Sequence, residues 1–160
     1  KITTSKTVVG QGYTTQINAT VSNQALNYET LHLTISANTT IVKTQITTLP
    51  SGDSTTVTFA WNTTGVAKGN HTITATVTQL QGETDTLDNT CVDGAVMVTI
   101  PGDVDGSRKV DWKDMYTGMI IRFNAKIGDP GYVPNSDVTC DGVIEWKDIY
   151  QAIIHFNESW

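Results

Sequence analysis

Two stretches of the chain carry oxygen-bearing side chains at a spacing that suits a metal ion. They are residues 103–114 and 137–148, and a shift of 34 positions places the first on the second. A calcium loop of EF-hand type has 12 residues and supplies ligands from positions 1, 3, 5, 9 and 12, with a backbone carbonyl from position 7. The matching residues are Asp103, Asp105, Ser107, Lys109 (carbonyl), Asp111 and Asp114 in the first stretch, and Asp137, Thr139, Asp141, Val143 (carbonyl), Glu145 and Asp148 in the second.

The chemistry of these ligands favours calcium, and the pair of stretches predicts two ions. Ca²⁺ is a hard cation that takes six to eight oxygens, whereas Mg²⁺ gives up its water reluctantly. Position 12 is Asp in both stretches, which is shorter than the usual Glu but can still bind with two oxygens. At position 6 the second stretch has Gly142 and the first has Arg108. Since a sharp turn there favours glycine, we expect the first loop to be more strained, although its fourth carboxylate, Asp111, acts in the opposite direction.

An apolar pattern of helical spacing follows each calcium stretch. Such a pattern gives each helix one apolar stripe, so the two predicted helices should pack on each other. Asp111 and Glu145 stand where the helices are expected to begin, with Asp114 and Asp148 three residues on, and negative charge is favourable there. The residues of the stripes are Met115, Tyr116, Met119, Ile120 and Phe123 in the first helix, and Ile149, Tyr150, Ile153, Ile154 and Phe156 in the second.

Residues 1–100 show a different pattern, in which apolar and polar residues alternate with period two. The alternation predicts around seven short strands with one buried face, separated by turn-forming residues. This is typical of a β-sandwich of immunoglobulin type, without the Cys–Trp–Cys core of antibody domains. Phe59 and Trp61 are predicted to be core residues. The clearest runs are Tyr13–Val21, Leu31–Ser36, Thr56–Trp61, Thr72–Thr78 and Val96–Ile100.

Several segments of this first half resemble the CARDB-like sandwich modules of archaeal and bacterial surface proteins. They are Ser5-Lys-Thr-Val-Val-Gly10, Trp61-Asn-Thr-Thr-Gly65, Gly69-Asn-His-Thr-Ile73 and Gly82-Glu-Thr-Asp-Thr-Leu-Asp-Asn89. The resemblance implies an Ig-like fold and an extracellular role. Such modules have a longer first strand, whereas here only Lys1–Thr4 precede the first segment. A shortened first strand leaves an unpaired edge, or a groove, that another chain can fill.

The second half resembles dockerin-like modules, which contain two calcium loops, each followed by a helix. The resemblance covers about residues 102–157 and includes the connector Gly128-Asp-Pro-Gly-Tyr-Val-Pro-Asn-Ser-Asp137. It implies a cohesin-like partner, bound through loop positions 10 and 11. Those positions hold Trp112-Lys113 and Trp146-Lys147, where cellulosomal dockerins often have small hydroxyl residues. The two tryptophans fit either internal packing or an exposed contact pair.

Composition and charge exclude several classes of function. The 160 residues have a formal net charge of −6, so nucleic-acid binding has no electrostatic basis. Threonine makes up 26 of the first 100 residues, which suits solvated sheet faces. No apolar run is long enough to span a membrane, and no signal peptide is present, as expected for a mature or trimmed chain. No catalytic triad, phosphate loop or isolated pair of carboxylates stands out, so we expect no enzyme.

Two further sets of residues are candidates for covalent modification. Five Asn-x-Ser/Thr sequons predict glycosylation, although unmodified Asn in turns is the alternative at each: Asn18, Asn38, Asn62, Asn70 and Asn157. Cys91 and Cys140 fall one in each half. They are either two free thiols or a disulfide that joins the halves, which an oxidising exterior would permit.

Together these features predict two domains, an Ig-like β-sandwich over residues 1–100 and a dockerin-like calcium module over residues 101–160. The favoured hypothesis is a non-catalytic, glycosylated, extracellular structural protein. Its partners would be copies of itself in a fibril or surface layer, joined by strand donation or edge pairing. The alternative is a binding module that docks a cohesin-like receptor.

Overall fold

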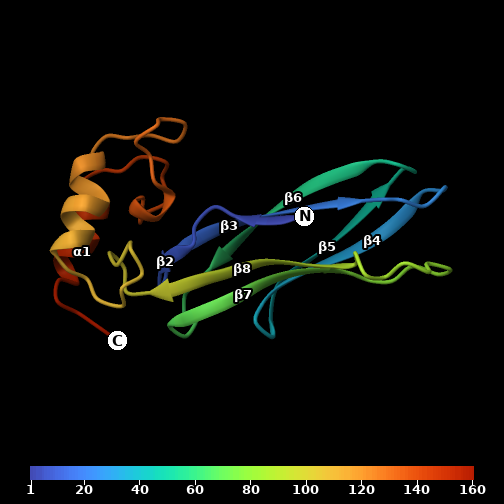
Figure 1. The fold of residues 1–160 in the computed structure, drawn as a ribbon, viewed down its shortest axis with the longest axis horizontal. Helices are drawn as coiled ribbons and strands as arrows, with labels where there is room; N and C mark the ends of the chain where they lie inside the picture. Colours follow the sequence, from blue (N-terminus) through green and yellow to red (C-terminus); the bar gives the residue numbers. More distant parts are fainter. The chain divides into compact units, whose positions relative to one another are not determined.

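The structure, a computed structural model, describes residues 1–160, and most of it is built from two β-sheets (Figure 1). One sheet has the strand order β1-β3-β6, and the other has the order β2-β8-β7-β4-β5. This mainly β, sandwich-like fold agrees with the prediction for the first 100 residues. The strands are β1 (Ile2–Thr4), β2 (Val8–Gly10), β3 (Thr14–Ser22), β4 (Glu29–Ala37), β5 (Thr40–Leu49), β6 (Ser54–Asn62), β7 (Gly69–Val77) and β8 (Thr90–Thr99).

The buried faces of the strands follow the alternation that predicted them. In β3, Ile17, Ala19 and Val21 are buried, and the residues between them are more exposed. Phe59 and Trp61 are both buried, which confirms them as core residues. β5 was not among the predicted runs. It is an edge strand that pairs with β4 and is mostly exposed, so it lacks the one-sided burial that produces alternation.

The chain divides into two compact units that do not follow the predicted boundary at residue 100. Unit one comprises Lys1–Thr4, Gln16–Ala60 and His71–Ala95. Unit two comprises Ser5–Thr15, Trp61–Asn70 and Val96–Trp160. Residues 103–114 and 137–148 therefore belong to a unit that also contains three segments from the predicted sandwich.

β1 lies at one edge of its sheet. β1 pairs antiparallel with β3, with Ile2 opposite Ala19. The last backbone hydrogen bonds of this pairing join Lys1 and Thr20, so Val21 and Ser22 extend beyond the end of β1. After a short break the chain continues as β2, which pairs in parallel with β8.

The two predicted helices differ in the structure. The second is an α-helix, α1 (Trp146–Ile154), with a capping box between Glu145 and Asp148. The first is not an α-helix: a π-helical segment, η1 (Asp114–Met119), continues into a 3₁₀ turn, η2 (Ile120–Arg122). A second 3₁₀ turn, η3 (Pro134–Ser136), precedes the second calcium stretch. The π-turn coincides with a close approach at Gly118, where a Cβ would lie 2.5 Å from Val104 Cγ2.

One hydrophobic core unites the helical segments of unit two. Only part of each predicted apolar stripe contributes to it: Met115 and Met119 are buried from the first segment, and Ile149 from α1. Ala152 of α1, which was not in the predicted stripe, is also buried there. The remaining stripe residues stay exposed. The buried residues of this core are Ile100, Val104, Val110, Met115, Met119, Val138, Ile144, Ile149 and Ala152.

None of the helices is long and apolar enough to cross a membrane.

Candidate metal centre

Loop one, residues 103–114, is organised by the carboxylates at its two ends. Asp103 and Asp114 are both buried. Asp114 accepts hydrogen bonds from the amides of Val104 (2.9 Å), Asp105 (3.3 Å) and Asp111 (2.9 Å). Asp103 accepts the amides of Ser107 (3.0 Å) and Arg108 (2.9 Å). The backbone of the loop is therefore wrapped around two carboxylates.

Three carboxylates of loop one meet at a single point. One oxygen each from Asp103, Asp105 and Asp114 lies within 4.8 Å of the other two. Burial raises the pKa of Asp103 and of Asp114 above the usual 3.8, in spite of the amide hydrogen bonds that lower it. Burial also raises the pKa of Asp105, but the Lys113 ammonium and Ser107 outweigh it and hold the pKa below 3.8. A cation at this point would offset the cost of keeping these charges out of water.

The remaining predicted ligands of loop one lie close by. The Ser107 hydroxyl donates to the Lys109 carbonyl at 3.0 Å, so positions 5 and 7 are adjacent. Asp111 accepts the amide of Lys113 at 2.8 Å. The Lys113 ammonium contacts Asp105 Oδ2 at 2.6 Å, but this ion pair is exposed and worth little.

Loop two, residues 137–148, repeats part of this arrangement. Asp137 and Asp148 are buried, like their counterparts. Asp148 accepts the amides of Thr139 (2.9 Å) and Glu145 (2.8 Å), which are positions 3 and 9, as in loop one. Asp137 accepts the amides of Cys140 (2.7 Å) and Gly142 (2.9 Å). Burial raises the pKa of Asp148.

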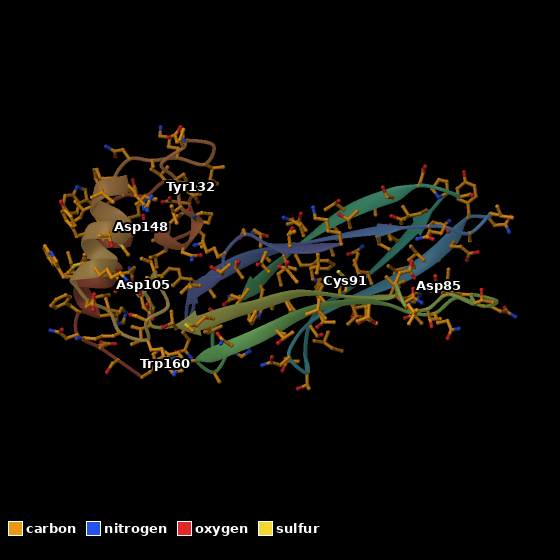
Figure 2. All side chains as sticks on the ribbon, viewed as in Figure 1. Asp85, Cys91, Asp105, Tyr132, Asp148 and Trp160 are labelled. Atoms are coloured by element: carbon orange, nitrogen blue, oxygen red, sulfur yellow. The ribbon has the colours of Figure 1, made fainter.

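The outer ligands of loop two are less converged than those of loop one. Position 3 is Thr139, whose hydroxyl donates to Asp148 at 3.0 Å. The carboxylates of Asp141 and Glu145 both contact the Lys147 ammonium, at 3.1 and 2.7 Å. Figure 2 shows Asp105 in loop one and Asp148 at the start of α1. Loop two therefore has the predicted donors, but a lysine holds two of them.

Both loops require a left-handed backbone at positions 4 and 6, and each has a glycine at only one of the two. In loop one Gly106 has a φ of 72° and Arg108 a φ of 71°. In loop two Cys140 has a φ of 64° and Gly142 a φ of 90°. Side chains other than glycine, Asn or Asp rarely adopt this conformation. The strain expected at Arg108 is present, and loop two has its own at Cys140.

The end of the chain supports loop one. Two backbone hydrogen bonds join Val110 of loop one to the last residues of the chain. The Val110 amide donates to the Glu158 carbonyl at 3.0 Å, and the Asn157 amide donates to the Val110 carbonyl at 2.8 Å. The Trp160 indole donates to Thr99 Oγ1 at 2.9 Å, and its ring lies 5.3 Å from the guanidinium carbon of Arg108. Thr99 in turn donates to Asp103 at 2.5 Å.

Two other side chains support loop two. The Tyr132 hydroxyl donates to Asp137 at 2.7 Å, and burial together with this bond raises the pKa of Tyr132. The buried Lys6 ammonium contacts the Asp137 carbonyl and lies 3.0 Å from Cys140 Sγ. Sequence reasoning did not identify Lys6, Tyr132, Thr99 or Trp160, because no local pattern links them to the loops.

The two cysteines are free thiols in the structure. Cys140 is exposed and its thiol donates to the Thr14 carbonyl at 2.9 Å. Cys91 is half-buried in unit one. Of the two alternatives, the structure records the free thiols, and a disulfide between Cys91 and Cys140 stays untested.

The Trp-Lys pairs at positions 10 and 11 are at the surface. Trp112 is 62% exposed and Trp146 is 68% exposed. Trp146 makes an edge contact with Phe123, whose ring centre lies 5.4 Å away. A shallow pocket beside it is lined by Thr139, Trp146, Lys147, Tyr150, Gln151 and Ile153. Of the two interpretations of these tryptophans, the exposed one fits the structure.

The five sequons lie mostly at the surface. Asn38, Asn62, Asn70 and Asn157 are exposed, whereas Asn18 is half-buried and accepts a hydrogen bond from Thr58 at 2.6 Å. Exposure is compatible with glycosylation at four of the positions, which stays a prediction.

The donor set fits a hard divalent cation. Loop one offers three converging carboxylates, a hydroxyl and a carbonyl, all oxygen, and calcium accepts such a set in flexible geometry. No sulfur or imidazole lies among the donors at the ligand positions, which argues against zinc or copper.

A comparison with known proteins identifies the larger part of the chain. The sequence profile of the CARDB family matches residues 1–91. The chain belongs to the CARDB family. A search of curated protein sequences returned no relative of the chain.

Solved CARDB structures share the fold. A CARDB domain from Pyrococcus furiosus, solved in complex with di-metal ions, is 23% identical with a TM-score of 0.52, over 61% of this chain and 83% of that one. A domain assigned to a cell surface protein of Methanosarcina acetivorans is 25% identical with a TM-score of 0.46, over 61% and 86%. A cohesin–X–dockerin complex from Acetivibrio cellulolyticus is a distant match, 20% identical with a TM-score of 0.32, over 81% of this chain and 83% of that one.

Proposed function

We propose that this CARDB protein is a non-catalytic, extracellular structural module whose second unit is clamped by two calcium ions. The observation that carries the proposal is the meeting of Asp103, Asp105 and Asp114 within 4.8 Å, with two of the three buried. Three carboxylates held this close repel each other unless a cation lies among them. Asp137 and Asp148 repeat the buried pair in loop two.

The role of the cations would be structural. Asp114 opens η1 and Asp148 lies in the first turn of α1, so each loop joins its ligands to the start of a helical segment. Metal that binds the folded loop and not the unfolded one adds its binding energy to the stability of the unit, about 2.7 kcal/mol when calcium is at 100 times Kd. The helices that would enter the loops of an EF-hand switch are missing, which favours a clamp over a sensor.

An extracellular location agrees with the proposed structural role of calcium. Extracellular calcium modules work with dissociation constants of about 10⁻⁴ to 10⁻³ M, which suits permanent structural sites outside the cell. The similar domain from Methanosarcina acetivorans is assigned to a cell surface protein. The exposed sequons, Asn38 and Asn62 among them, are consistent with a glycosylated surface.

Thermal unfolding with and without calcium tests the clamp. We expect added calcium to raise the melting temperature, an excess of chelator to lower it, and magnesium to substitute poorly. Hydrogen exchange should locate the loosened amides in loops one and two and α1, with the β4–β5 pairing as the internal reference. Equal melting temperatures in calcium and chelator would refute the clamp.

We further propose that copies of the module assemble through their sheet edges. The edge strand β5 spans Thr40–Leu49, contains no acidic residue or proline and exposes Ile41 and Ile46. Long exposed edges of this kind pair readily with other strands. Sedimentation in calcium should show species larger than the 17.4 kDa monomer. Ile46→Lys should reduce them, and a wild-type protein that stays monomeric at high concentration would contradict assembly.

The second candidate function is docking of a cohesin-like receptor by unit two. It is favoured by the exposure of Trp112 and Trp146, each followed by a lysine at the same loop position. Exposed aromatic side chains are common energetic centres of interfaces. Trp112→Ala and Trp146→Ala should abolish capture of a cohesin domain without a change in calcium binding, and wild-type protein that captures none would remove this candidate.

A further inference from the structure

Lys6 and Cys140 meet beside loop two, in a contact that the calcium clamp does not use. Lys6 lies in the short break between β1 and β2, and Cys140 occupies position 4 of loop two. The Nζ atom of Lys6 lies 3.0 Å from the Sγ atom of Cys140, although the two residues are 134 positions apart. Both belong to unit two. Because position 4 is not a ligand position of the loop, the pair is available for chemistry of its own.

Lys6 is an unusual lysine, because its charge is buried without a counter-charge. The residue is only 6% exposed. Its ammonium contacts the Asp137 carbonyl and the Cys140 sulfur, and it forms no ion pair. Lysine is rarely buried unless it is paired, since the removal of a charge from water is costly. A reaction that makes this nitrogen neutral would therefore relieve a cost in the folded protein.

Hydrogen bonds on both sides of the contact hold the two atoms in place. The Cys140 thiol donates to the Thr14 carbonyl at 2.9 Å, which leaves the sulfur lone pairs to accept from Lys6. Next to Lys6, the Thr7 amide donates to Asn135 Oδ1 at 3.1 Å, and Asn135 Nδ2 donates to the Thr7 hydroxyl at 3.0 Å. Reacting atoms that are poised for attack lie about 3 to 3.5 Å apart. The pair meets that condition at 3.0 Å.

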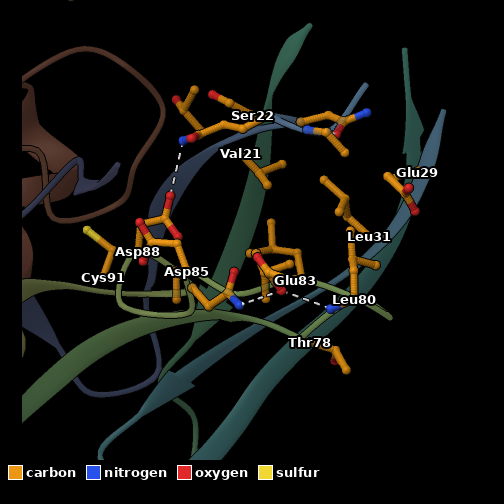
Figure 3. Close-up of a pocket in the computed structure, with 18 of the residues that line it drawn as sticks. Val21, Ser22, Glu29, Leu31, Thr78, Leu80, Glu83, Asp85, Asp88 and Cys91 are labelled. Carbon is orange, nitrogen blue, oxygen red and sulfur yellow. Dashed lines mark hydrogen bonds between the residues drawn. The ribbon is translucent and has the colours of Figure 1, made fainter. Parts of the chain in front are cut away.

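The surroundings of each cysteine decide what an oxidised sulfur would meet. Cys140 is exposed, so small oxidants in solution can reach it. It is the only cysteine of unit two, and within that unit the Lys6 nitrogen takes the place of a second thiol. Cys91 of unit one lines a groove together with the carboxylates of Asp85 and Asp88 (Figure 3). A carboxylate is a poorer nucleophile toward sulfur than an amine, so Cys91 provides an internal comparison.

We propose that oxidation by a hydroperoxide joins Lys6 to Cys140 through a covalent nitrogen–sulfur bond. In the first step the sulfur attacks one oxygen of hydrogen peroxide and the O–O bond breaks. The thiol is oxidised to a sulfenic acid, and the peroxide is reduced to water. In the second step the Lys6 nitrogen attacks the sulfur, the S–O bond breaks, and the hydroxide leaves as water with a proton from the nitrogen. The additional proton of the ammonium goes to solvent.

The product is a sulfenamide, in which the amine and the thiol have each lost one hydrogen. One peroxide is consumed and two waters are formed, so atoms and electrons balance. Sulfenic acids condense in this way even with a backbone nitrogen, which is a weaker nucleophile than a lysine amine. The bond would tie the segment Ser5–Thr15 to loop two across 134 positions, and cross-links that close long loops stabilise most in the chain-entropy model. This site goes beyond the calcium clamp, and neither step needs a bound cation.

Mass spectrometry of the full chain, treated with hydrogen peroxide, tests the proposal. The starting protein is Cys91→Ser, because a disulfide between the two cysteines would give the same loss of mass. We expect its mass to fall by about 2 Da, and a peptide map to show one cross-linked species that contains Lys6 and Cys140. Dithiothreitol should restore the original mass. Oxidation of Cys140 to a sulfinic acid with Lys6 unmodified would overturn the proposal.

Matched variants in the Cys91→Ser background assign the bond to this pair. Lys6→Arg keeps the positive charge but removes the primary amine, and Cys140→Ser removes the sulfur, so neither should lose mass. The control Lys68→Arg changes an exposed lysine of the same unit and should cross-link fully. Oxidation should raise the melting temperature of Cys91→Ser by about 10 °C, and reductant should reverse the rise.

The same loss of mass in Lys6→Arg would refute the assignment. If Lys6→Arg does not fold, the peptide map of Cys91→Ser still decides the question, because it identifies the joined residues directly. Calcium binding, measured on the same samples before oxidation, reports on the clamp separately.

Discussion

Loops one and two share a ligand pattern but differ in how far the protein alone assembles it. In loop one the carboxylates at positions 1, 3 and 12 already converge. In loop two the third position is Thr139, and Lys147 holds the acids at positions 5 and 9. The difference is one of preorganisation: a cation finds loop one nearly complete, whereas in loop two it must compete with an ammonium group.

The two loops also differ in where their glycine stands: loop one has it at position 4 and loop two at position 6. Each has one glycine for two left-handed positions, and the other residue contacts a different part of unit two. Arg108 stacks on Trp160, and Cys140 donates to Thr14. The two copies of the motif are therefore anchored to different parts of unit two. We expect loop one to bind calcium more tightly.

The largest effects should follow from changes at position 12. Asp114→Asn and Asp148→Asn each remove a buried ligand that also holds several loop amides. Each should weaken calcium binding in its own loop by about 100-fold. Calorimetric titration should show that Asp114→Asn removes the tighter step and Asp148→Asn the weaker one. The reverse assignment would break the comparison.

Two substitutions, each of which deletes one hydroxyl group, compare the hydrogen bonds that hold the position 1 carboxylate in each loop. Thr99→Val removes the donor to Asp103, and Tyr132→Phe removes the donor to Asp137. Each leaves a buried carboxylate short of one hydrogen bond, at a cost of about 1 to 2 kcal/mol in the free energy of unfolding. Denaturant unfolding of calcium-free protein measures both. Unchanged stability in either variant would show that the support in that loop is unimportant.

Two substitutions at position 6, one that relieves backbone strain and one that adds it, should change the free energy of unfolding in opposite directions. Arg108→Gly should stabilise the protein by up to about 1 kcal/mol, less what the lost contact with Trp160 contributes. Gly142→Ala should destabilise it by about 1 kcal/mol or more, because its φ is 90° and a Cβ would lie 3.3 Å from Ile127. The same unfolding experiment compares the two, and effects of equal sign would exclude strain as the cause.

The pH dependence gives the smallest and most specific effect. Asp103, Asp114 and Asp148 have pKa values raised above 3.8 in the folded state, so folded protein takes up protons more readily than unfolded. Without calcium, their contribution to stability therefore grows as pH falls through these raised values, whereas the lowered pKa of Asp105 acts oppositely. With calcium, the same protons displace the ion. The gap in melting temperature between calcium-bound and calcium-free protein should narrow as the pH falls toward and through these raised pKa values. A constant gap would contradict the assignment of these groups as ligands.

What the sequence predicted well is what depends on near neighbours. The oxygen donors of each loop lie within one short stretch, so spacing alone could group them, and Gly142 marked a left-handed position. Their role as calcium ligands stays a prediction. Alternation found Ile17, Leu33 and Trp61 as core residues for the same reason. The supports could not be found this way, because Lys6 and Asp137 are 131 positions apart and no period connects them.

The first predicted helix shows where a regular local pattern fails to predict the structure. Its apolar stripe was regular, yet the close approach of Gly118 to Val104 accompanies a π-turn, and Tyr116 and Ile120 remain exposed. Packing within unit two thus overrides a local pattern.

Calorimetric titration of the full wild-type chain with calcium is the most direct test of the central claim. The account predicts two bound ions per chain in two resolved steps, with magnesium binding much more weakly. No binding at millimolar calcium, or a stoichiometry that is unchanged when Asp114 and Asp148 are both replaced by Asn, would contradict it.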